Sequence, residues 1–440
     1  MSTTATGKTA RYLACLRLGT HKGARRVWLQ GNRLQATGFL KGARYSARTT
    51  AGVLRIRLSA TGDHKVSHKP SGAPVIDLLT RGLGDIDLVE VRFYRGEITV
   101  TVDPTDPRAR LVRLNARLAA GQPVRLGSLS HGGGVASEAI LRGLKAAGHK
   151  AQLSFANDIS NDYLDQARAH NPAWSASTLA VEADLGDINP ASLPECDVLE
   201  GGLPCVAASR AGRSKKHLGR PEEDVQVADL AAAFCEVIRV LQPAAIVLEN
   251  VPEYADSASA DLIRRRLGRW GYVIHERVLD GAEWSLEARS RWIMVATTRG
   301  LDIDLDALVG VREHTSLGEV LDKRTPAEDW HTFAHLDRKS ARDAAKGNKF
   351  QQRLLSASST SVPTLRRGYQ KGGSTDPRLA HPTRPGLSRL LSPAEHARIK
   401  GIPAQLIKGL PKTTAHEILG QSVISPAFAA LGSLVGAALA

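Results

Sequence analysis

The pattern of apolar and polar positions changes twice along the chain. Residues 1–24 are polar and basic, and we expect them to form a loose leader. From 25 to 103, short runs alternate between apolar and polar residues, which predicts strands and a β-rich module. From Val124 onward, short apolar runs alternate with segments of helical periodicity, which is typical of an α/β layered sheet.

The β-rich module contains the same order of elements twice. A strand, a short apolar segment and two alternating strands occur over Arg26–Leu58 and again over Pro74–Val102. This order predicts an internal repeat whose halves close as one pseudo-twofold unit. The first copy weakly resembles the swapped-hairpin β modules of transition-state regulators and toxin-like proteins. Many such modules bind DNA, but a structural or dimerising role fits equally well, so we assign no residues here.

The rest of the chain divides by rhythm. Residues 104–123, with Pro104 and Pro107 at their start, are interpreted as a linker. Residues 124–300 are expected to form a Rossmann-like cofactor-binding domain, with helices over Ser137–Ala147 and Asp229–Leu241. Residues 301–386 lose the α/β rhythm, and their later part is loop-like and basic. Residues 387–440 return to the domain, beginning with a helix capped by Ser392.

Composition narrows the class of protein. Lys and Arg outnumber Asp and Glu by 59 to 44, which gives a net charge of +15 and suits a polyanionic partner such as nucleic acid. The four cysteines form no Cys-x-x-Cys pair and no His cluster has ligand spacing, so no metal site and no disulfide framework are expected. No secretory core or long apolar run is present, and we expect a soluble, cytoplasmic protein.

A cysteine stands at the end of a short apolar strand. The run Asp197–Cys205 passes through two glycines and Pro204, and a loop with several cations follows: Arg210, Arg213, Lys215 and Lys216. Positive charge favours the thiolate, which is the nucleophilic form of cysteine. The alternative is that Cys205 is simply a small packed residue.

Two acidic positions and a glycine loop have the spacing of a cofactor site. The loop Ser130–Gly134 lies between a strand and a helix, as in nucleotide-binding turns. Asp158 ends the next strand and could accept hydrogen bonds from ribose hydroxyls, and a carboxylate of the turn Asp184–Ile188 could accept one from an adenine amine. A tight turn and two solvated turn acids are the alternatives.

A further acid and two arginines lie at strand ends. Glu249 closes the apolar strand Ala244–Leu248, where a carboxylate is costly unless it is used. Arg289 and Arg291 would lie on one face of the strand they are expected to share, which indicates a bound anion, carbonyl or carboxylate. An exposed strand-end glutamate is the alternative reading for Glu249.

In this order, the motifs resemble those of the DNA (cytosine-5)-methyltransferases from about Val124 to the C-terminus. The matching stretches are Gly202–Cys205, Glu249–Val251, Arg289–Arg291, Arg389–Pro403 and Gly420–Val423. The resemblance implies a methyltransferase fold that uses S-adenosyl-L-methionine, a flipped cytosine in double-stranded DNA and a target-recognition region over 301–386. It assigns Cys205 to attack on C6, Glu249 to N3, Arg291 to O2 and Arg289 to a supporting role. Its implied cofactor residues are Ser130, His131, Gly132, Gly134, Asp158, Ile159, Asp187, Ile188, Pro204, Gln421 and Ser422.

Several positions depart from the family pattern. They are Leu203 and Val206 beside the cysteine, Ser130 for an aromatic residue, Asp158 for a glutamate, Glu287 for a glutamine and Gln421 for an asparagine. None removes a group that makes or breaks bonds. An RNA cytosine methyltransferase and a catalytically silent DNA-binding relative stay open as alternatives, and so does a companion restriction endonuclease. The Asp/Asn-Pro-Pro-aromatic turn of amino-group methyltransferases is absent from the sequence.

Overall fold

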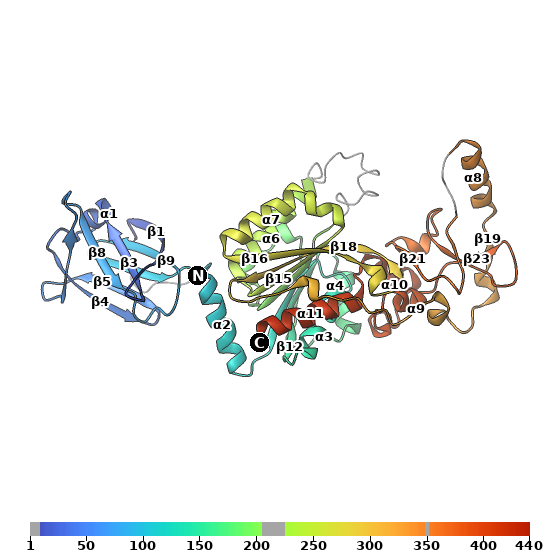
Figure 1. Ribbon diagram of the computed structural model, residues 1–440, viewed down its shortest axis with the longest axis horizontal. Coiled ribbons are helices and arrows are strands. Elements are labelled where there is room, and N and C mark those ends of the chain that lie inside the picture. Colours follow the sequence, from blue (N-terminus) through green and yellow to red (C-terminus); the bar gives the residue numbers. More distant parts are fainter. Residues whose placement is uncertain (1–8, 205–224, 348–351) are drawn as a thin grey trace. The chain divides into compact units, whose positions relative to one another are not determined.

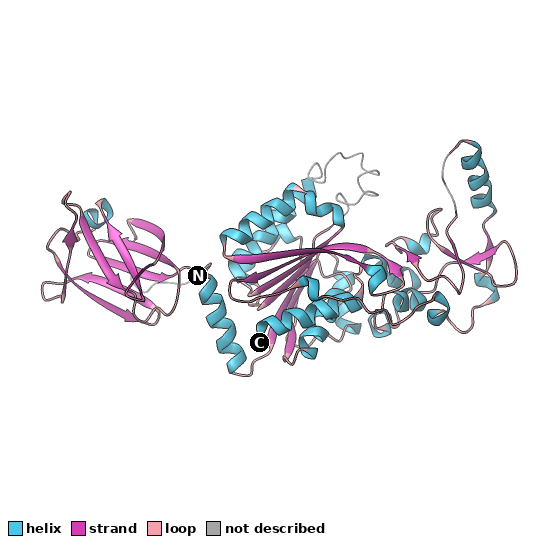
Figure 2. Ribbon diagram, viewed as in Figure 1, coloured by secondary structure: helices cyan, strands magenta, loops and turns pink. Residues whose placement is uncertain are grey.

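The computed structural model describes residues 9–204, 225–347 and 352–440. It contains two compact units, one of Met1–Ala116 with Arg269–Tyr272 and one of Arg117–Gly268 with Val273–Ala440. Figure 1 labels the elements of both units, and Figure 2 shows that the first is mainly strand while the second mixes helices and strands.

The first unit consists of two antiparallel sheets. The larger has the order β1-β9-β10-β5-β4-β6 and the smaller β2-β3-β8-β7. The strands are β1 (Tyr12–Arg17), β2 (Gly19–His21), β3 (Ala24–Gln30), β4 (Arg44–Thr50), β5 (Val53–Leu58), β6 (His64–Lys65), β7 (Ser67–His68), β8 (Pro74–Leu79), β9 (Leu88–Tyr94) and β10 (Glu97–Val102). In the larger sheet, β9 and β10 on one side of the centre correspond to β4 and β5 on the other, and in the smaller sheet the central strands are β3 and β8. Each corresponding pair has one strand from each of the two similar stretches of sequence.

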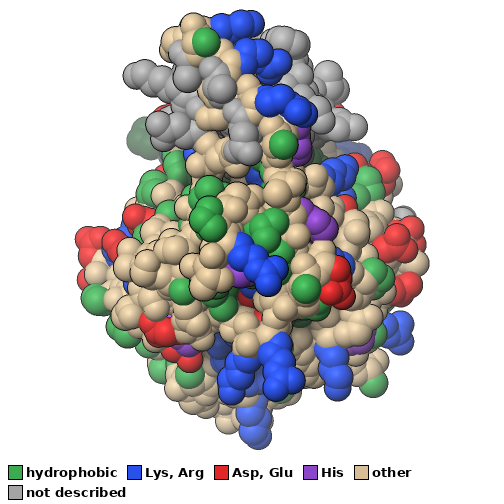
Figure 3. All heavy atoms as spheres, turned by 90° about the vertical axis from the view of Figure 1, so that its right-hand side faces the viewer, with side chains coloured by type: hydrophobic (Ala, Val, Ile, Leu, Met, Phe, Trp, Pro, Cys, Tyr) green, Lys and Arg blue, Asp and Glu red, His purple; other side chains and the backbone are tan. Residues whose placement is uncertain are grey.

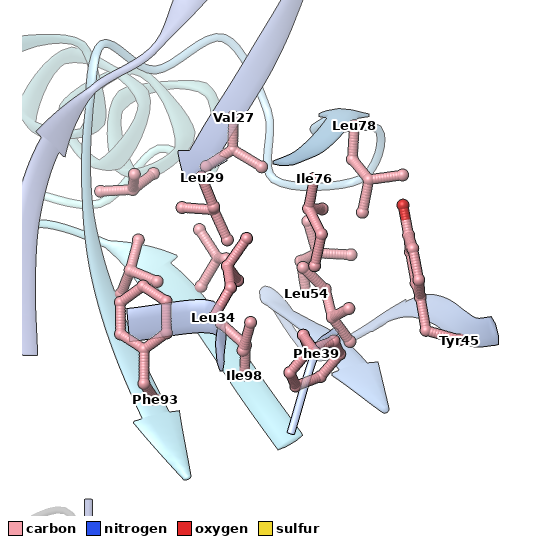
Figure 4. Packing of buried hydrophobic residues seen from close by; sticks show 14 of the residues in the cluster. Val27, Leu29, Leu34, Phe39, Tyr45, Leu54, Ile76, Leu78, Phe93 and Ile98 are labelled. Atoms are coloured by element: carbon pink, nitrogen blue, oxygen red, sulfur yellow. The ribbon is translucent and has the colours of Figure 1, made fainter. Parts of the chain in front are cut away.

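Alternation along these strands builds one apolar core. Figure 4 shows Leu29, Ile76, Leu54 and Ile98 directed toward the space between the strands, and all four are buried. Leu34, from the short helix α1 (Asn32–Ala36), completes this core. The polar residues between them face outward, so the larger sheet has one open face.

The expected leader and linker both contain regular structure. β1 lies within 1–24 and pairs with β9, because Ala14 and Leu16 pack on the core while Cys15 and Arg17 stay exposed. The linker contains helix α2 (Pro107–Ala119). Asp106 begins it by accepting a hydrogen bond from the backbone N–H of Ala109. Pro107 occupies the first turn of this helix, where proline is tolerated.

The second unit is built on a seven-stranded sheet of order β13-β12-β11-β14-β15-β18-β16. Its strands are β11 (Val124–Leu129), β12 (Ala151–Asp158), β13 (Leu179–Glu182), β14 (Val198–Gly202), β15 (Ala245–Asn250), β16 (Tyr272–Asp280) and β18 (Ser290–Thr298). The five strands β11 to β15 run parallel, and β18 is antiparallel to β15. The expected α/β class is confirmed.

Helices cover both faces of this sheet. Figure 1 shows α6 (Val225–Leu241) and α7 (Ala258–Arg269) on one face and α3 (Val135–Ala146) with the C-terminal α11 (Ser425–Leu439) on the other. α3 and α11 approach closely at Gly143 and Gly432, where an added Cβ would lie 2.1 Å and 2.4 Å from backbone oxygens of the opposite helix. The C-terminal helix therefore packs over the sheet beside α3.

Residues 301–386 hold more structure than the loop-like pattern indicated. They contain α8 (Ala334–Ala345), and β19 (His331–Thr332), β20 (Leu354–Leu355) and β22 (Arg378–Ala380) form a small sheet with β23 (Leu387–Arg389); β21 (Val362–Pro363) pairs with β17 (Glu287–Ala288). Short apolar pairs such as Leu354–Leu355 are too brief to show a period in the sequence. α9 (Pro393–Ile399) begins with the predicted Ser392–Glu395 capping box, and α10 (Lys412–Gln421) follows.

Among the described residues, no single helix is long and apolar enough to cross a membrane. α10 and α11 pass that test only as a pair bent by 47°. In the same part of the chain, no group of three or more His, Cys, Asp and Glu side chains could hold a metal ion.

Candidate active site

The functional segments converge on one edge of the seven-stranded sheet. The chain runs from β11 outward to β12 and β13, then crosses back to β14 on the other side of β11. Ligands of open α/β sheets bind at such a switch point, beyond the carboxyl ends of the strands. Ser130–Gly134 follows β11, Asp158 ends β12, Pro204 follows β14, and Glu249 is the penultimate residue of β15.

Glu249 is paired with Arg291. The guanidinium Nε lies 2.7 Å from Glu249 Oε1, and the side chains are only 15% and 18% exposed respectively. Arg291 is the second residue of the antiparallel β18, so it reaches the same edge as the end of β15. Because both side chains are partly exposed, each could release the other and instead form hydrogen bonds to the polar edge of a bound ring.

The backbone that leads to Cys205 is fixed beside this pair. Gly202 stands opposite Glu249 in the parallel register, and a Cβ added to it would lie 3.7 Å from Glu249 Oε2. The Asn250 side-chain amide donates a hydrogen bond of 3.1 Å to the Leu203 carbonyl. Cys205 itself and the basic loop after it lie outside the described residues.

The glycine loop is held by Asp158. Gly132 donates its N–H to Asp158 Oδ2 at 2.7 Å, and Ser160 donates its N–H to Oδ1 at 2.9 Å. Each carboxylate oxygen keeps a second lone pair, so Asp158 can hold the loop and still accept from a ligand hydroxyl. Gly134 has a φ of 71° and precedes α3 directly. The loop thus exposes backbone groups at a helix N-terminus.

The remaining cofactor candidates lie around this loop. Ile159 is 70% exposed, which is unusual for a large apolar side chain beside a polar loop and fits a surface that a planar ring would cover. Gln421 donates its side-chain amide to the Tyr163 hydroxyl at 3.1 Å, which joins the end of α10 to α4 (Asn161–His170). Asp187 ends a 3₁₀ turn after β13 and is exposed, and Ile188 follows it, half-buried.

His131 is engaged in a buried chain of hydrogen bonds. The Trp174 indole N–H donates to His131 Nε2 at 3.2 Å, and because an indole only donates, the ring proton lies on Nδ1. Nδ1 then donates to Ser128 Oγ at 2.7 Å, and Ser128 Oγ donates to Glu200 Oε1. The His131 side chain therefore faces the interior, and its backbone N–H donates to the Asn157 carbonyl at 2.8 Å.

Burial shifts the pKa values of two residues in this network, His131 and Glu200. Burial lowers the pKa of His131 to about 3, so the ring stays neutral at physiological pH. Burial raises the pKa of Glu200 to about 8, the charge of Glu249 adds to the rise, and the Ser128 hydroxyl opposes it. The sequence analysis missed Ser128, Glu200 and Trp174. The only signal was an acid inside the apolar strand that leads to Cys205.

Arg289 and Arg291 have different partners. β18 begins at Ser290, so Arg289 lies outside the strand, and the expected alternation does not apply to it. Arg289 is 6% exposed, and its Nη1 lies 3.9 Å from Glu287 Oε1. Glu287 Oε1 also accepts the N–H of Leu365 at 2.6 Å. Arg289 thus lies in the layer that supports the site.

A buried lysine joins this layer to the C-terminal segment. Lys400, fully buried at the end of α9, places Nζ 3.5 Å from Glu287 Oε2 and donates to the carbonyls of Leu419 and Ser422. The second of these bonds measures 2.7 Å. Burial lowers the pKa of Lys400 to about 7, against the opposing effect of Glu287. Lys400 therefore fixes the backbone at Ser422, a cofactor candidate.

Comparison with known families decides what kind of site this is. The profile described as C-5 cytosine-specific DNA methylase matches residues 138–436. The chain belongs to this family. The resemblance seen in the sequence motifs is confirmed, and the protein is an enzyme of the C-5 cytosine DNA methyltransferase family.

Two bacterial relatives of this methyltransferase are similar over most of the catalytic part. Type II methyltransferase M.NlaX of Neisseria lactamica is 26% identical over 314 residues, which is 68% of this chain and 93% of the relative. The DNA-cytosine methyltransferase of Escherichia coli K12 is 28% identical over 332 residues, with 63% and 69% covered.

Solved structures show the same fold at lower identity. The Dnmt2 methyltransferase of S. pombe aligns with a TM-score of 0.57 at 18% identity, covering 71% of this chain and 98% of its own. The methyltransferase EhMeth of Entamoeba histolytica aligns with a TM-score of 0.58 at 16% identity and the same coverage. The expected Rossmann-like methyltransferase fold is confirmed.

Proposed function

We propose that the enzyme transfers a methyl group from S-adenosyl-L-methionine to C5 of cytosine in double-stranded DNA, with Cys205 as nucleophile and Glu249 as acid. The observation that carries this proposal is the strand register. Gly202 lies opposite Glu249, and Asn250 holds the Leu203 carbonyl, so the last described residues before Cys205 lie beside the acid. Cys205 and Glu249 could then both contact the same cytosine ring.

The reaction needs both groups at once. C5 of cytosine is a poor nucleophile, so the Cys205 thiolate adds to C6 while Glu249 protonates N3, and the electron pair moves to C5. C5 takes the methyl group. Loss of the C5 proton and departure of the thiolate restore the ring. Arg291 would leave Glu249 and donate to the cytosine O2, with Arg289 supporting the strand start. Because a stacked base hides C6, the target cytosine is turned out of the duplex.

The cofactor supplies an electrophilic methyl group. The residues that surround the switch point fit its parts: the backbone of Ser130–Gly134 for the methionine end, Asp158 for the ribose hydroxyls, and Ile159 for one face of the adenine. Asp187 and Ile188 would contact the adenine edge. Pro204, Gln421 and Ser422 would complete the pocket, the last held by Lys400.

The target-recognition region would contact the DNA backbone. Arg338, Arg342 and Lys346 follow one another at intervals of four residues along and just past α8, and all three are exposed. This spacing places them on one face of a helix. Figure 3 shows Lys and Arg side chains gathered at the end of the molecule that carries α8. Such a row suits a phosphate strand.

Bisulfite sequencing of host DNA from cells that express the protein tests the proposal. Protected cytosines in a fixed sequence context are expected with the wild-type enzyme and none with Cys205→Ala. Glu249→Gln keeps a hydrogen-bonding amide but no transferable proton, so protection should fall by a factor of roughly 10² or more. Protection that persists in the Cys205→Ala variant would refute the covalent mechanism.

Purified protein and tritiated S-adenosyl-L-methionine separate the substrate classes. Label is expected in duplex DNA and not in RNA. Label in RNA alone would support an RNA cytosine methyltransferase, and label in neither would support a silent DNA-binding relative. The named type II methyltransferase relatives make a companion restriction endonuclease part of the proposal. Host DNA methylated by the enzyme should then resist cleavage by a restriction endonuclease that recognises the same sequence. We place this methylation in the cytoplasm.

A further inference from the structure

Most of the net positive charge lies outside the region that matches the methylase family. Residues 1–116 contain 20 Lys and Arg against 8 Asp and Glu, a net charge of +12 out of +15 for the whole chain. The catalytic unit is therefore close to neutral overall. A family enzyme that meets DNA only through its catalytic and recognition parts has no need for this distribution.

The charge is concentrated on the open face of the six-stranded sheet. Strand alternation and register place seven cations on this face, named here the basic face: Arg17, Arg44, Arg48, Arg55, Arg57, Lys65 and Arg92. Two strand acids, Glu90 and Glu97, share it, and Asp103 lies at its edge beside the exposed Cys15. Glu97 pairs with Arg57 at 3.1 Å and more distantly with Arg55 at 3.9 Å, and Glu90 pairs with Arg92 at 2.5 Å.

Two pairs of like charges stand directly opposite each other on this face. Arg48 faces Arg55 across β4 and β5, and Arg44 faces Lys65 across β4 and β6. Like charges in direct cross-strand register are destabilising. Their presence on a sheet whose core is otherwise well packed indicates that a negatively charged partner uses them.

Hydroxyl side chains lie between the cations. Thr99 stands between Arg92 and Arg55 in the register, which gives a row across four strands that ends at Arg48. Neighbouring strands are ~4.8 Å apart, so this row spans ~14 Å. Arginine and hydroxyl donors in a flat row suit phosphate oxygens, which accept hydrogen bonds without regard to base sequence.

We infer that the basic face is a second DNA-binding surface, which holds the phosphate backbone of duplex DNA independently of the catalytic site. The choice of DNA as the polyanion rests on the proposed function. The surface would raise the local concentration of DNA around the recognition region and would not select a sequence.

The test uses the full-length protein and a labelled 30-base-pair duplex, with no methyl donor present. The variant Arg44→Gln/Arg48→Gln/Arg55→Gln removes both like-charge pairs, together with the Arg55–Glu97 contact and the hydrogen bond from Arg44 to the Gly62 carbonyl. It leaves Arg57 and Arg92 with their acids. A matched control, Lys22→Gln/Lys69→Gln/Arg81→Gln, changes three exposed turn cations of the same unit by the same charge.

Fluorescence anisotropy at several salt concentrations should separate the two variants. If each arginine contacts a phosphate, the salt slope falls by roughly 0.9 per contact, and affinity at 0.1 M salt falls roughly eightfold per contact. The control should keep the wild-type slope. With saturating DNA, kcat of the variant should equal that of the wild type while KM for DNA rises.

Two results would overturn the inference: equal slopes for the two variants, or a reduced slope only with duplex RNA. The proposed function is tested by a different measurement, methyl transfer by the wild type. If the wild type transfers no methyl group, the binding of the two variants can still be compared.

Discussion

Glu200 offers the sharpest test of the buried network. Its carboxyl lies on the strand that leads to Cys205, is 5% exposed and accepts a hydrogen bond from Ser128. Replacement by glutamine keeps the shape and the accepting oxygen but cannot ionise. The substitution Glu200→Gln therefore isolates the cost of burying a negative charge at this position.

The expected magnitude follows from linkage. The pKa of Glu200 is raised from 4.5 to about 8, so the folded protein holds a proton that the unfolded chain has lost between these values. Stability of the wild type must then fall as pH rises through this window. Integrating the two titrations gives a loss of ~2–3 kcal/mol between pH 6 and pH 9 that the Gln variant does not suffer.

Thermal unfolding followed at pH 6, 7.5 and 9 provides the assay. The Gln variant should gain on the wild type as pH rises, by about 5 °C in Tm at pH 9 relative to its difference at pH 6. Glu182→Gln, at an exposed position of the edge strand β13, is the matched control and should track the wild type. Parallel pH profiles for wild type and Glu200→Gln would refute the assignment of a protonated buried acid.

Three further outcomes are expected. Asn250→Ala should lower kcat roughly tenfold with the affinity for DNA retained, because the backbone before the cysteine loop loses its donor; single-turnover kinetics and anisotropy check this. Trp174→Phe should cost about 1 kcal/mol in urea unfolding, since His131 Nε2 loses its donor in a buried site. Glu287→Gln and Lys400→Gln should each cost about 3–5 kcal/mol, while the double variant recovers most of it, as measured by a double-mutant cycle.

Local signals carried the predictions that succeeded. The Ser392–Glu395 capping box could be read because its partners lie three residues apart, and the strands around Gly202 and Glu249 could be read because each is a continuous apolar run. β1 was missed since a polar, basic segment concealed the alternation of Ala14 and Leu16. α2 was missed because prolines mark both loops and first helical turns.

Pairs distant in sequence could not be foreseen. Ser128 and Glu200 are 72 residues apart, and no local pattern in either segment indicates that the two side chains are in contact. The sequence could state that an acid inside an apolar strand is costly, but only the neighbouring strand shows what satisfies it. The same holds for His131, which the sequence placed at the cofactor and whose ring the structure commits to Ser128 and Trp174.

The departure at Glu287 shows why single positions mislead. Taken alone, an acid in place of the family's glutamine would bring an uncompensated negative charge into a fully buried position, which is expensive. In the structure Lys400 lies 3.5 Å away, and both side chains are 0% exposed. Lys400 also fixes the Leu419 and Ser422 carbonyls. The charge at Glu287 is therefore compensated by the same lysine that holds the C-terminal cofactor segment, so a change at one site must be judged together with the other.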